Sequence, residues 1–108
     1  MRVRYLTIPR NQKGLEEYNQ GIEYSENLYA FELPEDEFDI LYSSGVFGAI
    51  NEECGLLIDD YESESIARKD FSKCISIIEN VSGLPEQSVF REALKLASEE
   101  GIMFAMDF

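Results

Sequence analysis

The chain has 108 residues, of which 44% are hydrophobic, enough for one domain with a single modest core. Its formal net charge of −13 at pH 7 disfavours binding to DNA, RNA and anionic membranes. Histidine is absent, which removes the commonest general base and the His-containing catalytic and zinc sites. We therefore expect a globular protein that is not an enzyme and that needs no cofactor.

Two strands are predicted in the first third of the chain. Residues 2–8 are rich in β-branched and aromatic side chains and stop at Pro9. Residues 27–33 alternate between two sets of side chains, as a half-buried strand does. The polar residues 11–26 between these strands predict a short helix or a loop.

A helix is predicted to begin after the second strand, at Pro34. The acidic residues Glu35, Asp36 and Glu37 would then occupy its first turn, where the helix dipole favours negative charge. The simplest interpretation of these three residues is that they begin the helix and face water. Residues 43–45, Ser-Ser-Gly, should end it.

Three more helices and a strand are predicted in the rest of the chain. A short helix over 46–54 should end at Gly55, and the apolar spacing predicts another over 67–81. A last helix should begin at Pro85, before a terminal strand over 102–108. Strands at both ends with helices between them predict a single α+β domain spanning residues 1–108. Its short helices should cover one face of a small sheet in which the terminal strands can be neighbours.

The negative charge is unevenly distributed along the chain. From Gly14 to Ala67 there are 15 acidic residues and no Lys or Arg. Such a segment attracts cationic surfaces, although acidity also keeps small proteins soluble. Both interpretations remain open: a solubilising surface and an acidic face with a function.

The stretch GLLIDDYESES, residues 55–65, combines acids with one aromatic residue and no base. Its candidate binding residues are Asp59, Asp60, Tyr61, Glu62 and Glu64. As a calcium loop beginning at Asp60, the stretch has Ser65 in place of the glycine at position 6 and Phe71 in place of the glutamate at position 12. A metal site is therefore a poor match, and none is predicted.

A contact surface for a cationic protein suits this stretch better. Its acids would speed association and pair with Lys or Arg, and Tyr61 would supply packing area. Glu35, Asp36 and Asp39 are expected to extend the same face. Two alternatives remain open, that Tyr61 packs on the core and that the stretch is a plain solvated turn.

The two cysteines, Cys54 and Cys74, lie in apolar surroundings without a ligand or redox motif. The N-terminus MRVRYLTIPR does not resemble a signal peptide, and no apolar run is long enough to span a membrane. We therefore expect reduced thiols and a cytoplasmic protein.

The segments GVFGAINEECGLLIDDYESESI (45–66) and ALKLASEEGIMFAMDF (93–108) resemble the small immunity proteins of bacterial toxin–immunity systems, including contact-dependent growth inhibition. The resemblance implies a single α+β domain that binds a cognate toxin domain in the cytosol and blocks its active site or a nearby face. Such toxins are often nucleases, whose basic surfaces would suit an acidic inhibitor. No functional residue is carried over from this resemblance.

Two other functions compete with this hypothesis. An acidic mimic of nucleic acid would inhibit a DNA- or RNA-binding protein and would compete with DNA for several such proteins. A small divalent-metal-binding protein would bind Ca²⁺, Mg²⁺ or Mn²⁺ through its carboxylates. The sequence leaves open the identity of the toxin, the mode of inhibition and the oligomeric state.

Overall fold

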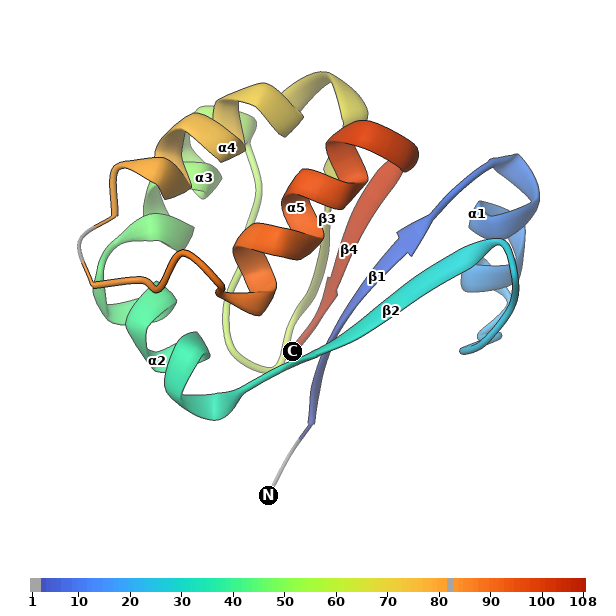
Figure 1. Ribbon diagram of the computed structural model, residues 1–108, viewed down its shortest axis with the longest axis horizontal. Coiled ribbons are helices and arrows are strands. Elements are labelled where there is room, and N and C mark those ends of the chain that lie inside the picture. The colour runs from blue at the N-terminus through green and yellow to red at the C-terminus, as the bar shows by residue number, and fades with distance from the viewer. Residues whose placement is uncertain (1–2, 82) are drawn as a thin grey trace.

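The computed structural model describes residues 3–81 and 83–108, which form four strands and five α-helices (Figure 1). In chain order they are β1 (Arg4–Pro9), α1 (Gln12–Asn19), β2 (Leu28–Leu33), α2 (Glu35–Ser43), α3 (Val46–Cys54), β3 (Ser63–Ala67), α4 (Phe71–Glu79), α5 (Val89–Glu100) and β4 (Met103–Asp107). A 3-10 turn, Arg68–Asp70, precedes α4. Arg2 of the predicted first strand and Ser82 of the turn before the last helix lie outside the described residues.

The four strands form one antiparallel sheet in the order β2-β1-β4-β3. The first and last strands are therefore neighbours, as the sequence predicts. Tyr5 lies opposite Glu32 on one side and Asp107 on the other, and Asp107 lies opposite Ser63. This register brings residues from all four strands into one row at the end of the sheet where β1 begins. The predicted α+β fold is confirmed.

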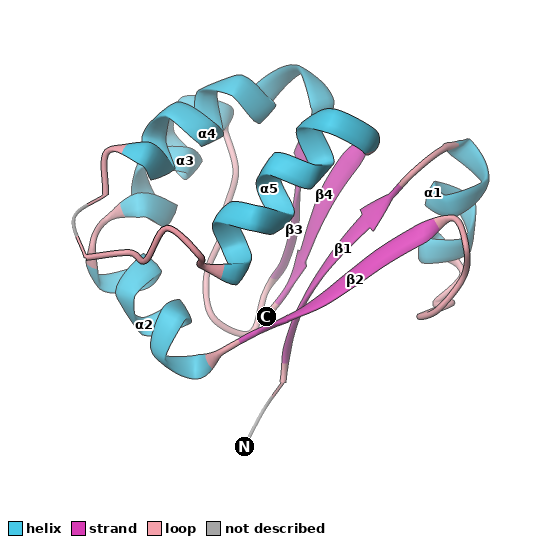
Figure 2. Ribbon diagram, in the orientation of Figure 1, coloured by secondary structure: helices cyan, strands magenta, loops and turns pink. Residues whose placement is uncertain are grey.

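Helices α2 to α5 lie on one face of the sheet, and α5 contacts β1, β2 and β4 (Figure 2). Leu6 of β1 and Phe104 of β4 point into this layer and are fully buried. Five phenylalanine rings pack there with centroids 5.3–5.8 Å apart. They are Phe38, Phe47, Phe90, Phe104 and Phe108. The core thus lies between these helices and one side of the sheet.

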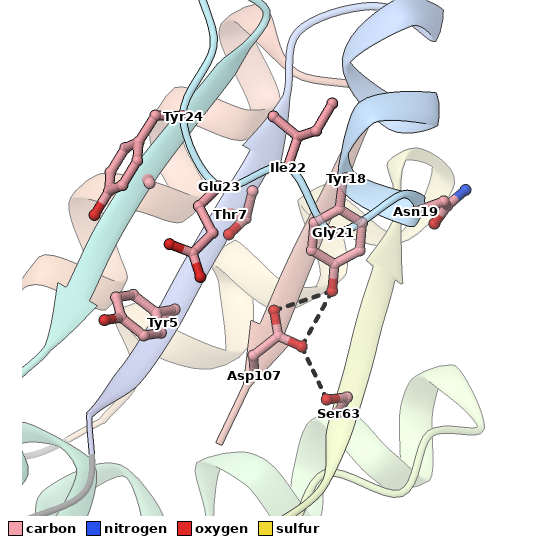
Figure 3. A pocket seen from close by; sticks show the side chains of 11 residues that line it. Tyr5, Thr7, Tyr18, Asn19, Gly21, Ile22, Glu23, Tyr24, Ser63 and Asp107 are labelled. Atoms are coloured by element: carbon pink, nitrogen blue, oxygen red, sulfur yellow. Dashed lines mark hydrogen bonds between the residues drawn. The ribbon is translucent and has the colours of Figure 1, made fainter.

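Helix α1 lies beside the β1–β2 end of the sheet, and residues 20–24 follow it across the other face (Figures 1 and 3). Asn11 caps this helix by accepting the N–H of Gly14 at 2.9 Å. Gly14 packs so closely that a Cβ there would stand 2.3 Å from the carbonyl oxygen of Asn27. Only a glycine allows α1 to approach the chain this closely.

Two features of the chain differ from the sequence-based expectations. The last helix does not begin at Pro85, because residues 85–88 form a turn and Ser88 is the N-cap, accepting the N–H of Arg91 at 3.0 Å. Strand β3 was not predicted. It is a short edge strand in which Ile66 is the one buried side chain, so its sequence SESIA lacks a regular apolar alternation.

The described residues form a small, compact unit. Its principal extents are 36 × 33 × 25 Å, and its radius of gyration is 12.9 Å. None of the described helices has the length and apolar character that crossing a membrane requires.

Candidate functional site

The predicted acidic residues lie on two segments, the start of α2 and the loop that leads into β3. We call the surface formed by six of these acids and two tyrosines the turn surface. It consists of Glu35, Asp36, Asp39, Tyr42, Asp59, Asp60, Tyr61 and Glu62. Because α2 follows β2 directly and the loop precedes β3, both segments reach the same end of the sheet.

Arg4 joins the two segments of the turn surface. Its guanidinium group donates hydrogen bonds to the carboxylates of Glu35 and Asp60, the latter at 3.0 Å. It also lies over the ring of Phe38, 3.7 Å from the centroid, and its side chain is only 7% exposed. Burial lowers the pKa of Arg4, but the hydrogen bonds to Glu35 and Asp60 outweigh it, so the pKa is raised overall. Two of the predicted acids therefore share one internal cation, and the three side chains together keep one net negative charge.

A tyrosine provides a second link between α2 and the loop. The hydroxyl of Tyr42 donates to Asp59 at 2.9 Å, and the same carboxylate oxygen accepts the N–H of Asp60 at 2.8 Å. The hydrogen bond to Asp59, followed by the charge of that residue, raises the pKa of Tyr42. Tyr42 thus remains a donor that holds the loop against the helix, with its ring half exposed.

Tyr61 stands at the tip of the loop, and its side chain is 80% exposed. The alternative that it packs on the core is therefore wrong. Its φ of 66° lies in the left-handed region, which disfavours a non-glycine residue by about 1–2 kcal/mol. Strain of this kind persists where the surrounding structure maintains it, and it is common at binding sites. Tyr61 is thus an exposed side chain at the tip of the loop, carried on a backbone in the left-handed conformation.

The two remaining acids of the predicted stretch, Glu62 before β3 and Glu64 within it, have separate environments. Glu64 accepts the N–H of Leu57 at 3.0 Å and its neighbour's N–H at 3.1 Å, so it shapes the loop entering β3. Glu62 is exposed, and its carbonyl accepts the N–H of Phe108 at 3.1 Å. Within residues 3–81 and 83–108, no three His, Cys, Asp or Glu side chains are grouped so as to hold a metal ion.

On helix α2, two acids are exposed and one is not. Asp36 and Asp39 face solvent, and Asp36 also accepts the N–H of Glu37 at 2.9 Å. The interpretation that Glu37 faces water is wrong, because only 7% of it is exposed. Its carboxylate accepts the N–H groups of Val89 at 2.8 Å and Phe90 at 3.1 Å, and so caps the start of α5. Burial raises the pKa of Glu37, and these hydrogen bonds only partly oppose that shift.

The opposite face of the sheet has a pocket of about 480 Å³ that the sequence did not suggest. Figure 3 shows it between the sheet and the segment that follows α1. At its floor, the carboxylate of Asp107 accepts hydrogen bonds from Tyr18 and Ser63. The available signal was the alternation in residues 102–108, which places Asp107 on the face opposite Phe104 and Met106.

The two thiols are close together and are not joined by a disulfide bond. Cys54 at the end of α3 and Cys74 in α4 have their sulfur atoms 3.8 Å apart. Burial, followed by the neighbouring Cys54, raises the pKa of Cys74 to about 12. Cys74 is therefore a protonated, unreactive thiol at neutral pH.

The fold and the turn surface define an α+β domain with an acidic, tyrosine-bearing surface at one end of its sheet. Comparisons of the chain with protein-family models, with curated proteins and with solved structures found no match in any of the three.

Proposed function

We propose that this chain is a cytoplasmic immunity protein that binds and neutralises a cationic, nuclease-like bacterial toxin, and that the turn surface contacts the toxin. One observation carries the proposal. Acids from two segments that are distant in the sequence lie around two exposed tyrosines, Tyr42 and Tyr61, at one end of the sheet. Clustered acids with aromatic anchors suit a basic protein surface.

The acids of the turn surface would have different roles in such a complex. Glu35 and Asp60 pair with Arg4, so they maintain the shape of the surface. Asp36, Asp39 and Glu62 are exposed and are therefore better placed to pair with Lys or Arg of the toxin. Tyr61, at the tip, would provide the apolar contact area that makes a few residues dominate binding.

The electrostatic field of these acids would act on the toxin before the two proteins touch. The concentration of acids between residues 14 and 67 gives the α2 and loop region a negative potential. Oppositely charged proteins associate faster because this field orients them as they approach. An inhibitor that must occupy a toxin before it reaches its substrate benefits from such a rate.

The direct experiment uses the neighbouring gene. The C-terminal region of the protein encoded immediately upstream would be expressed in bacteria with and without this chain, and growth and co-purification would be measured. The proposal expects the upstream region to be toxic, this chain to restore growth, and the two to form a stable complex. A neighbour that is harmless and does not bind would contradict it.

Matched variants then test the surface. Asp39→Asn with Glu62→Gln should weaken the complex by more than about 1 kcal/mol, and Tyr61→Ala by a similar amount. Glu79→Gln with Glu99→Gln removes the same charge from exposed positions of α4 and α5 and should leave affinity nearly unchanged. Equal weakening by both pairs would show that total charge, not this surface, matters. Competition with DNA for several unrelated DNA-binding proteins would favour the nucleic-acid mimic instead.

A further inference from the structure

The pocket on the sheet face opposite α2–α5 has an unusual lining of aromatic and acidic side chains. Tyr5 comes from β1, Tyr18 from α1 and Tyr24 from the segment that follows it, and two acids, Glu23 and Asp107, complete the group (Figure 3). We call this group the tyrosine pocket. Its volume of about 480 Å³ lies within the range of ligand sites, about 300–1,000 Å³.

The carboxylate at the floor of the pocket is held in position by neutral donors. The hydroxyl of Tyr18 lies 3.1 and 3.0 Å from the two oxygens of Asp107, and that of Ser63 lies 2.8 Å from one of them. Burial, followed by the charge of Asp107, raises the pKa of Tyr18, so this hydroxyl remains a donor at physiological pH. Two hydroxyl hydrogens leave part of the accepting capacity of the carboxylate unused.

No cation balances the acids of this pocket among the residues that the structure describes. Its lining contains no Lys or Arg, and no described salt bridge involves Glu23 or Asp107. Glu32 on the same face lies opposite Tyr5 and adds negative charge. Burial, followed by the charge of Glu32, raises the pKa of Tyr5, and Glu23 contributes to the same shift. The pocket is therefore electronegative as well as aromatic.

We propose that the tyrosine pocket binds the guanidinium group of an arginine side chain presented by a protein partner. A guanidinium group is planar, stacks on aromatic rings and donates paired hydrogen bonds to a carboxylate. The pocket offers these features together: the rings of Tyr5 and Tyr24 at its rim and Asp107 at its floor. An ammonium group would match the charge and can lie over a ring, but it has no plane to stack and lacks the paired donors of a guanidinium group.

The identification of the protein that presents this arginine rests on the proposed function. The match between the pocket and a guanidinium group does not. Glu62 of the turn surface immediately precedes Ser63, whose hydroxyl bonds to Asp107 in the pocket. The two sites therefore adjoin at the start of β3, on either side of the sheet end. A cationic protein that contacts the turn surface is thus positioned to insert an arginine into the pocket.

The test uses the free protein and a small probe, so it needs no toxin. N-acetyl-arginine amide would be titrated into the ¹⁵N-labelled chain and followed by NMR, with N-acetyl-citrulline amide as the neutral isostere. The proposal expects saturable shifts at Thr7, Ser63 and Asp107, with a dissociation constant of about 1–10 mM. Shifts of equal size with the citrulline compound, or none with the arginine compound, would overturn it.

Variants locate the binding. Glu23→Gln and Tyr24→Ala change exposed residues outside the regular elements, and each should weaken arginine binding at least about threefold. Asp107→Asn should weaken it more, and its spectrum shows whether the fold persists. Glu99→Gln, in α5, should change nothing. Unchanged affinity in Glu23→Gln and Tyr24→Ala would place the probe elsewhere and contradict the assignment.

Two results separate this inference from the proposed function. Growth rescue by the chain without arginine binding in the pocket would overturn the pocket assignment alone. Arginine binding in the pocket without growth rescue would support the pocket assignment and would exclude the toxin as the protein that presents the arginine. Tighter binding of free arginine than of the blocked probe would indicate a small-molecule ligand and contradict the protein source.

Discussion

The turn surface and the tyrosine pocket have similar compositions but different charge environments. In the turn surface, Arg4 lies between Glu35 and Asp60 and pairs with both, so its one positive charge offsets part of their negative charge. In the pocket, Asp107 is held by the hydroxyls of Tyr18 and Ser63. Acidic residues near tyrosines can therefore serve the fold in one place and remain available to a cation in another. The number of acids in a segment does not distinguish these cases, whereas their partners do.

The largest effect is expected from the removal of Arg4. Arg4→Met keeps the packing on Phe38 but removes two charge-assisted hydrogen bonds, to Glu35 and Asp60, so the free energy of unfolding should fall by about 2–4 kcal/mol. Urea unfolding would measure it. Arg4→Lys should also lose more than about 1 kcal/mol, because one ammonium group cannot replace the planar fork over the ring. A loss below about 0.5 kcal/mol in both variants would refute the structural role of Arg4.

The position of α1, which supplies Tyr18 to the pocket, depends on a close contact. Gly14→Ala would place a Cβ against the carbonyl oxygen of Asn27, so we expect a loss of about 2 kcal/mol and a displaced Tyr18. Gly48→Ala is the matched control, since nothing lies within 4 Å of its Cβ position in α3. That variant should gain about 0.5–1 kcal/mol. Thermal unfolding of both variants checks the pair, and equal effects would contradict the contact.

Glu37 offers a third environment, a buried carboxylate that caps a helix. Glu37→Gln loses one of the two acceptors for the N–H groups of Val89 and Phe90, so stability at neutral pH should fall by about 1–2 kcal/mol. Because folding raises the pKa of Glu37, its protonation favours the folded state at low pH, and this contribution disappears as pH rises through the raised value.

The difference in unfolding free energy between the wild type and Glu37→Gln should therefore be larger near pH 4 than near pH 7. Urea unfolding at both pH values provides the measurement. A difference that grows as pH rises would mean that folding lowers the pKa of Glu37, so that the hydrogen bonds from Val89 and Phe90 outweigh burial, contrary to the raised pKa described above.

The smallest expected effect concerns the pocket itself. Tyr18→Phe removes the hydroxyl that donates to Asp107 but keeps the ring, so we expect a loss of about 1 kcal/mol. If this variant were as destabilising as Arg4→Met, the pocket acids would be as deeply integrated into the fold as those of the turn surface. The acids of the two sites would then not differ in their contribution to stability.

Local patterns explain which parts of this molecule are predictable from its sequence. Apolar spacing and a terminal glycine predict α3, and Gly55 has the left-handed φ of 67° that such a helix end uses. Strand β3 was missed because an edge strand with one buried side chain has no clear alternation. The helix predicted from Pro85 begins later, since Ser88 is the better N-cap.

The candidate site was predictable only in part. All eight predicted acidic and tyrosine positions are in the described part of the chain, but their partners are not local. Arg4 lies 56 residues from Asp60, and Tyr18 lies 89 residues from Asp107, so the pairings depend on the sheet order. A count of charges in residues 14–67 cannot include Arg4, and so it overstates the unpaired acidity of this surface.

The first measurement to make is the salt dependence of association with the region encoded upstream, which the proposed function expects to be toxic. Stopped-flow mixing at about 50 mM and about 500 mM NaCl would give the association rate constant for the wild type and for Asp39→Asn with Glu62→Gln. We expect at least about a tenfold fall with salt for the wild type and a clearly smaller fall for the variant. Rates that are independent of salt and equal in both proteins would contradict an electrostatic role for the turn surface.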